Sequence, residues 1–181
     1  MIFTPTPLAG SFVVRLTPNS DHRGWFARAY CKNEFAQIGH TKEFVQMNQS
    51  YTREKGALRG MHFQRTPNRE IKLVRCIAGS VYDVIVDLRA GSPTFGQWFG
   101  AELSAENKKM MYVPEGFAHG FQTLEEDSEL LYLVSEFYAP GVEGGLRYND
   151  PALKIQWPLP VSDLSEKDAN HPFLTENFTG L

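Results

Sequence analysis

The chain has 181 residues, with 18 Lys and Arg against 21 Asp and Glu and a formal net charge of −3. This balance argues against nucleic acid as the main partner, because proteins that track phosphate backbones are usually basic. Cys31 and Cys76 lie in no metal-binding spacing, which indicates a reduced, cytoplasmic protein. With no signal-peptide pattern and no apolar run of membrane-spanning length, we expect one soluble domain over residues 1–181.

The first fifty residues are expected to combine strands with one helix. Alternating apolar side chains predict a strand over residues 11–16 and another over residues 44–50. Between them, Phe35 and Ile38 have helical spacing, so we expect a helix over residues 31–38 that ends at Gly39.

Residues 21–30 alternate charged with aromatic side chains around a glycine. Trp25, Phe26 and Tyr30 suit stacking on a nucleobase or a sugar, and they equally suit the core side of an edge strand. For Phe26 we expect a place in the core.

From residue 57 onward, short apolar stretches separated by Gly and Pro turns follow one another about every ten residues. They predict strands over residues 58–64, 71–76, 81–88, 95–103, 109–114, 117–124 and 129–138. Many short strands with almost no helix favour an all-β sandwich or jelly roll, with its core in residues 51–150. The C-terminal segment, residues 151–181, either packs back or frays, and residues 164–168 resemble the start of a short helix.

Two neighbouring predicted strands carry an imidazole and an ammonium toward the same interior. His62 is on one strand, and Lys72 begins the next among Ile, Leu and Val. Imidazole titrates near neutrality and is the usual protein base, whereas a lysine in an apolar strand either extends to solvent or takes part in chemistry. The alternative is a half-exposed histidine and a solvated lysine.

Three further polar groups stand inside apolar strands. Tyr132 lies between two leucines, so its hydroxyl must find a partner or face a cavity. Asp83 and Asp87 share a strand face with apolar residues. Inward carboxylates need a partner. Either both carboxylates point to solvent or they meet Lys72 and Arg59 inside, and for Asp83 we expect the interior.

A metal centre needs about three convergent histidine or carboxylate ligands. His62 has no second histidine on its strand, and His119 is on another strand without a carboxylate at a supporting spacing. We therefore expect no metal. Arginines suited to holding a phosphate or diphosphate bidentately are present at Arg23, Arg28, Arg59 and Arg69, with ordinary surface charge as the alternative for each.

Eight motifs in order resemble one family, the nucleotide-4-keto-6-deoxy-sugar epimerases of the cupin superfamily, typified by dTDP-4-dehydrorhamnose 3,5-epimerase. The resemblance runs from about Ser11 to Asp168. The motifs are residues 21–26 (DHRGWF), 58–64 (LRGMHFQ), 72–75 (KLVR), 86–89 (VDLR), 92–96 (SPTFG), 113–121 (VPEGFAHGF), 149–151 (NDP) and 165–168 (SEKD).

This resemblance implies a cupin-type jelly roll (a double-stranded β-helix) with a few short helices, no cofactor, and a homodimer that exchanges N-terminal strands. It implies epimerisation at C3, at C5 or at both, most simply of dTDP-4-dehydro-6-deoxyglucose to dTDP-4-dehydrorhamnose through an enolate, in deoxysugar and O-antigen biosynthesis. His62 would be the base oriented by Asp168, Lys72 would stabilise the enolate, and Tyr132 would return the proton. Arg23 and Arg59 would hold the diphosphate. The rest of the site would be lined by Gln46, Asn48, His119, Tyr138, Glu143 and Lys167.

Several residues depart from the family pattern. Arg28 stands where a glutamate on the thymine side is common. A guanidinium only donates hydrogen bonds and favours an acceptor edge such as that of cytosine, so CDP is the first alternative nucleotide. Residues 69–71 (REI) replace the commoner Ala-Gln-Gly, Leu133 replaces a lysine and Tyr148 a tryptophan.

Alternatives from other classes are a cupin 3,4-ketoisomerase and a metal-dependent cupin oxygenase or sugar-binding module. The ketoisomerases usually lack a tyrosine acid, whereas this chain has Tyr132 in that place. The presence of His62, Lys72 and Tyr132 together therefore favours the epimerase.

Overall fold

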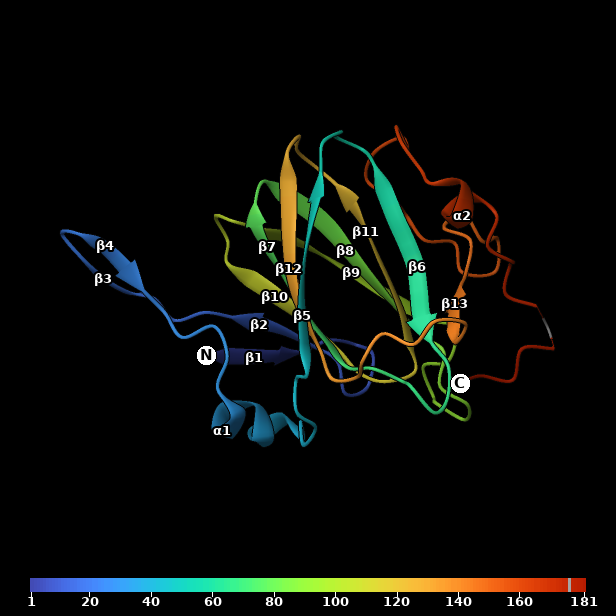
Figure 1. The fold of residues 1–181 in the computed structure, drawn as a ribbon, viewed down its shortest axis with the longest axis horizontal. Coiled ribbons are helices and arrows are strands. Elements are labelled where there is room, and N and C mark those ends of the chain that lie inside the picture. Colours follow the sequence, from blue (N-terminus) through green and yellow to red (C-terminus); the bar gives the residue numbers. More distant parts are fainter. Residues whose placement is uncertain (176) are drawn as a thin grey trace.

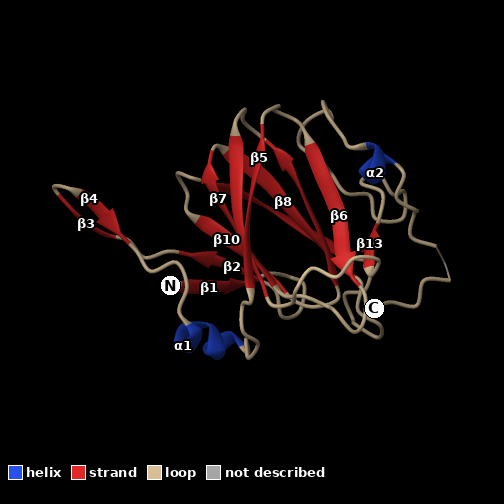
Figure 2. Ribbon diagram, in the orientation of Figure 1, coloured by secondary structure: helices blue, strands red, loops and turns tan. Residues whose placement is uncertain are grey.

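In the computed structural model, which describes residues 1–175 and 177–181, two antiparallel sheets face each other (Figures 1 and 2). One sheet contains, in spatial order, β1 (Ile2–Pro5), β2 (Phe12–Arg15), β10 (Lys109–Val113), β7 (Lys72–Ala78), β12 (Ser128–Val134) and β5 (Gln46–Thr52). The other contains β13 (Glu143–Gly145), β6 (Leu58–Gln64), β11 (Phe117–Thr123), β8 (Ser80–Asp87) and β9 (Trp98–Ser104). The cupin-type jelly roll expected from the sequence is confirmed.

The main core lies between the sheets and follows from the two-residue period of the strands. Along β8, Val81 and Ile85 are fully buried against residues of the opposite sheet such as Val74 and Leu130. The intervening Val84 belongs to a second apolar cluster on the outer face. Because β8 is buried on both faces, it reads in the sequence as a nearly continuous apolar run.

The C-terminal segment covers that outer face. Leu153, Trp157 and Leu174 pack in the same cluster as Met61 and Val84. A parallel bridge between Leu58 and Leu164, together with a 2.9 Å hydrogen bond from the Leu58 amide to the Asp163 carbonyl, ties the segment to β6. The segment therefore packs back, and it brings the short helix α2 (Glu166–Ala169) beside β6, as Figure 1 shows.

The helix expected over residues 31–38 is present, but only its first part is α-helical. α1 (Lys32–Phe35) continues into one 3-10 turn, η1 (Ala36–Ile38), and the chain then reverses at Gly39 with a left-handed φ of 83°. Phe35 is fully buried beneath the first sheet. Among the residues described, no helix is long and apolar enough to cross a membrane.

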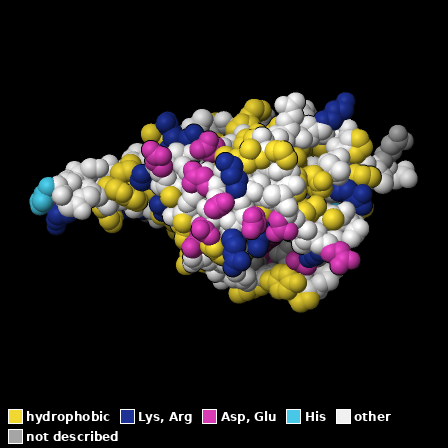
Figure 3. All heavy atoms as spheres, turned by 90° about the horizontal axis from the view of Figure 1, so that it is seen from above, with side chains coloured by type: hydrophobic (Ala, Val, Ile, Leu, Met, Phe, Trp, Pro, Cys, Tyr) yellow, Lys and Arg dark blue, Asp and Glu magenta, His cyan; other side chains and the backbone are white. Residues whose placement is uncertain are grey.

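Strands β3 (Asn19–Asp21) and β4 (Gly24–Phe26) pair only with each other and form an arm that extends away from the sheets (Figure 1). The arm also stands clear of the body when seen from above (Figure 3). Phe26 on it is 76% exposed and Trp25 is 50% exposed. The expectation that Phe26 belongs to the core is wrong within this chain, because the arm packs on neither sheet.

Candidate active site

His62 is placed by an unusually close approach of two strands of the second sheet. Gly60 has a φ of 130°, and a Cβ on it would fall 2.5 Å from the Cα of Gly120 on β11. Only glycine fits there, so β6 and β11 lie close together and His62 and His119 become direct cross-strand partners. Gly60 is thus the residue of the LRGMHF motif that the local packing beside His62 requires.

His62 makes its shortest polar contact with Asp168 of α2. His62 Nε2 and Asp168 Oδ1 are 2.6 Å apart, and Asp168 Oδ2 accepts a 3.2 Å hydrogen bond from the Gly60 amide. Burial alone raises the pKa of Asp168, but its bond to His62, the Gly60 amide and the Ser165 hydroxyl hold that pKa below its usual value. The carboxylate stays ionised, so it fixes the imidazole tautomer with hydrogen on Nε2 and leaves Nδ1 free to accept a proton.

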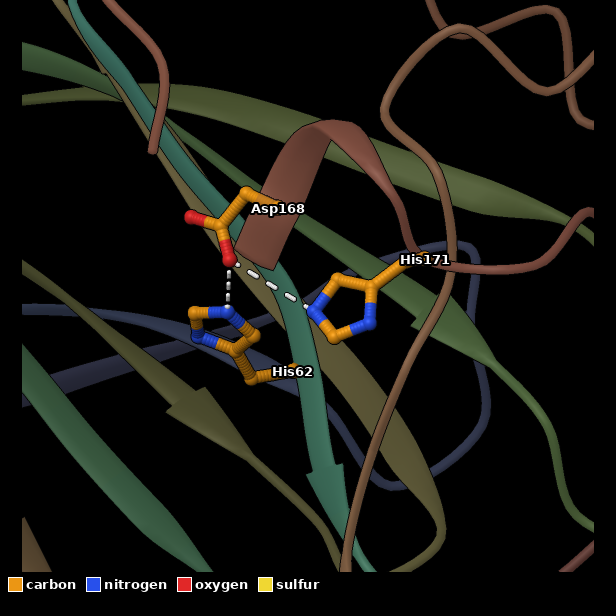
Figure 4. A group of neighbouring side chains, drawn as sticks. All are labelled: His62, Asp168 and His171. Atoms are coloured by element: carbon orange, nitrogen blue, oxygen red, sulfur yellow. Dashed lines mark hydrogen bonds and ion pairs between the residues drawn. The ribbon is translucent and has the colours of Figure 1, made fainter. Parts of the chain in front are cut away.

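A second histidine approaches the same oxygen of this carboxylate (Figure 4). His171 Nε2 is 3.5 Å from Asp168 Oδ1, and the His62 and His171 ring centroids are 5.5 Å apart. One ligand atom from each of His62, Asp168 and His171 lies within 4.8 Å of the other two. The sequence argument against a metal rested on finding no second histidine and no carboxylate near His62, and the structure supplies both.

Lys72 and Tyr132 face His62 across two small cavities of about 170 and 200 Å³. Both residues come from the first sheet, whereas His62 comes from the second, so the cavities lie between the sheets. Lys72 Nζ is 3.1 Å from Glu70 Oε1, and each of these side chains is less than 15% exposed. Burial, and then the Glu70 carboxylate, raise the pKa of Tyr132, which keeps its phenol protonated and able to donate.

Most of the expected binding residues surround the same space. Gln46 Nε2 donates a 2.9 Å hydrogen bond to Asn48 Oδ1, and both residues line the smaller cavity. Arg59 and His119 line the larger one. Tyr138 and Glu143 also border the smaller cavity. Lys167 and Arg59 border a wider opening of about 640 Å³ that leads to His62 and Asp168.

The buried aspartates have different partners from those expected. Asp83 is fully buried, as predicted, but it accepts a 2.8 Å hydrogen bond from His119 Nε2. Asp87 accepts two bonds from the Arg89 guanidinium, at 2.9 and 2.6 Å. The expectation that Lys72 and Arg59 meet these carboxylates is therefore wrong.

Arg23 and Arg28 lie outside the cavities that contain His62. Arg23 is on the arm, 78% exposed, and pairs with Asp21 at 2.6 Å. Arg28 is 63% exposed and pairs with Glu34 at 3.0 Å. Their role in substrate binding stays a prediction.

Two residues near the chemistry were not assigned to the site from the sequence. Glu70 enters the sequence analysis only as part of residues 69–71, and its charge two residues before Lys72 is the signal that could have assigned it to the site. His171 carried no such signal except its place three residues after Asp168.

The family model for dTDP-4-dehydrorhamnose 3,5-epimerase matches residues 5–176. The chain is 46% identical over 178 residues to the dTDP-4-dehydrorhamnose 3,5-epimerase of Salmonella typhimurium, covering 97% of each protein. It is 49% identical over 167 residues to the enzyme of the same name from Pseudomonas aeruginosa, covering 90% of this chain and 91% of that protein.

A crystal structure of the Bacillus anthracis dTDP-4-dehydrorhamnose 3,5-epimerase with TDP and pyrophosphate bound superposes with a TM-score of 0.92 at 42% identity, covering 96% of this chain and 99% of that chain. These matches extend over nearly the whole fold and include the strands and the helix that carry His62, Lys72, Tyr132 and Asp168. The chain belongs to the dTDP-4-dehydrorhamnose 3,5-epimerase family and is an isomerase.

Proposed function

We propose that this enzyme inverts C3 and C5 of dTDP-4-dehydro-6-deoxyglucose to give dTDP-4-dehydrorhamnose, without a cofactor, through an enolate. The observation that carries the proposal is the convergence of a base, a cation and a phenol on the same cavities, from His62, Lys72 and Tyr132. C3 and C5 both flank the C4 ketone, so one such set serves both carbons.

His62 removes the proton. With Asp168 holding the hydrogen on Nε2, the Nδ1 lone pair is the basic site, and the ionised carboxylate stabilises the imidazolium that forms. The 40% exposure of the His62 side chain leaves this ring open to a bound sugar. Because Asp168 is only 5% exposed, it is shielded from competing water.

Lys72 and Tyr132 complete the inversion. The Lys72 ammonium stabilises the enolate oxygen as charge develops, an effect of several kcal/mol in comparable sites. Tyr132 returns a proton from the opposite side, because it is on the sheet that faces β6. Its protonated phenol suits that role.

The diphosphate and nucleoside would be held at the wider opening by Arg59 and Lys167, with Gln46, Asn48 and Tyr138 near the sugar. We further propose a cytoplasmic homodimer in which the arm of one subunit reaches the site of the other. The exposed Trp25 and Phe26 support this, because an arm with such apolar side chains is stabilised by packing on a second copy. This arrangement would bring Arg23 of one subunit to the diphosphate in the site of the other. Light scattering after size exclusion tests the dimer.

Incubation with dTDP-4-dehydro-6-deoxyglucose in D2O, followed by NMR, tests the reaction. Deuterium at both C3 and C5 of the product is the expected result. Deuterium at one carbon would make the protein a single epimerase, and binding without any exchange would contradict the catalytic proposal.

A further inference from the structure

We propose that His62, Asp168 and His171 form a binding site for a divalent transition metal such as Zn²⁺, and that bound metal blocks the epimerase. The site would thus be inhibitory. Metal binding itself does not depend on the proposed function, whereas the inhibition rests on the proposed role of His62.

The three residues come from different parts of the fold and converge on one point (Figure 4). His62 is on β6, Asp168 is in α2, and His171 lies in the loop after α2. Asp168 Oδ1 is 2.6 Å from His62 Nε2 and 3.5 Å from His171 Nε2. Two imidazoles and one carboxylate are a common ligand set for Zn²⁺ and related ions, which leave a further position for water.

His171 Nε2 is the observation that points to a ligand. It is buried, and among the residues described it has no hydrogen-bond partner. Its 3.5 Å separation from Asp168 is longer than a normal hydrogen bond. A buried ring nitrogen without a partner is unfavourable, and a metal ion at this point would give it one.

The His171 ring is also fixed in place before any ion arrives. A Cβ on Gly145 would fall 2.4 Å from the ring, so the glycine of β13 packs directly against it. The His171 carbonyl accepts a 3.0 Å hydrogen bond from Arg147 Nε. Little reordering is therefore needed for this ring to act as a ligand.

Charges around the site are compatible with a cation. Asp168 supplies the negative charge at the centre of the site, because its Oδ1 lies beside Nε2 of both imidazoles. The Lys167 ammonium is itself paired with Glu143 at 3.0 Å, which offsets its charge. The wide opening bordered by His62 and Asp168 gives an ion access from solvent.

Metal binding would disable the base. A metal on His62 Nε2 displaces the hydrogen there to solvent and replaces the bond to Asp168. The positive charge then withdraws electron density from the ring, so Nδ1 no longer accepts a proton efficiently. The other buried His–carboxylate pair, His119 with Asp83, has no third ligand of this kind among the described residues.

The test uses the full chain, freed of metal by chelator, in the wild type and in His171→Ala and His171→Asn. Zn²⁺ binding is measured by calorimetry, Co²⁺ binding by its visible absorption, and epimerase activity with and without Zn²⁺. His22→Ala, which removes an exposed histidine on the arm, is the matched control. Thermal melting shows whether each variant is folded.

We expect the wild type and His22→Ala to bind one equivalent of Zn²⁺ and to lose activity as it binds. Both His171 variants should need at least about tenfold more Zn²⁺ for binding and for inhibition, each measured against the activity of the same variant in chelator. Equal Zn²⁺ binding by wild type and folded His171 variants, or no stoichiometric binding, would overturn the site. Binding that depends on His171 but leaves activity unchanged would uphold the site and contradict the role of His62.

Discussion

The carboxylate of Glu70 lies 3.1 Å from the ammonium of Lys72, inside the cavity where the proposed enolate would form. An anion on this lysine competes with the developing enolate for its positive charge. The same carboxylate contributes to the raised pKa of Tyr132, after the larger effect of burial.

Glu70→Gln should therefore increase kcat by about threefold or more, because it frees the Lys72 ammonium for the transition state. It should also lower the pKa of Tyr132, since an anion that destabilises the phenolate is removed. The alkaline limb of the pH–rate profile, where Tyr132 loses its proton, should move to lower pH. A decrease in kcat with no movement of this limb would show that Glu70 does not act through Lys72 and Tyr132.

Tyr132→Phe should separate proton removal from inversion. The base and the enolate stabiliser remain, so solvent deuterium should still enter the substrate. Formation of the inverted product should fall about 10²-fold or more, the usual contribution of a general acid. NMR in D2O gives both rates in one experiment. An equal loss of exchange and inversion would remove Tyr132 from the acid role.

Asp87 should contribute to acid stability. Burial alone raises its pKa, but the bonds from Arg89, Ser92 and Thr94 lower it from 3.8 to about 2. A carboxylate whose pKa is lower in the folded state than in the unfolded state stabilises the fold at pH values above its unfolded pKa. This stabilisation, about 2 kcal/mol in total, is lost as the pH falls through the folded-state pKa of about 2.

Urea unfolding of Asp87→Asn and of the wild type tests this, measured from about pH 6 down to the Asp87 pKa of about 2. The variant should be less stable at neutral pH and should lose less stability on acidification than the wild type. Asp163→Asn, an exposed carboxylate, is the control and should follow the wild type. Parallel pH curves for Asp87→Asn and wild type would contradict the assignment.

Arg28 allows a test of whether the enzyme prefers a thymidine or a cytidine nucleotide. If its guanidinium reaches the base, it should favour the acceptor edge of cytosine over thymine. In this chain it pairs with Glu34 at 3.0 Å, and the relatives are named for dTDP sugars, so we expect dTDP to bind more tightly. Calorimetry with dTDP and CDP tests this, with Arg28→Ala as the paired variant. Tighter binding of CDP that is lost in Arg28→Ala would support the cytidine alternative.

The fold could be predicted from the sequence because strands follow short-range patterns, whereas most of the candidate site residues are implied by the resemblance to the epimerase family. His62, Lys72 and Tyr132 each stand in a strand whose two-residue period fixes the side of the sheet they face. The position of the arm could not be predicted from such a pattern. Whether Phe26 packs against its own body or stays exposed depends on the path of the chain around it, which alternation does not report.

Contacts between residues that are far apart in the sequence could not be predicted either. The pairing of His119 with Asp83 depends on the register of β8 against β11, in which Asp83 lies opposite Phe121. The approach of His171 to Asp168 depends on the path of the loop after α2. Neither relation is local in sequence, except that His171 follows Asp168 by three residues.

Deuterium exchange in His62→Ala tests the central claim most directly. The variant should stay folded by thermal melting and should bind dTDP as the wild type does, so that only the base is lost. In D2O with the 4-keto sugar nucleotide, we expect exchange at both C3 and C5 to fall by about 10²-fold or more. Exchange at either carbon at the wild-type rate would contradict the account.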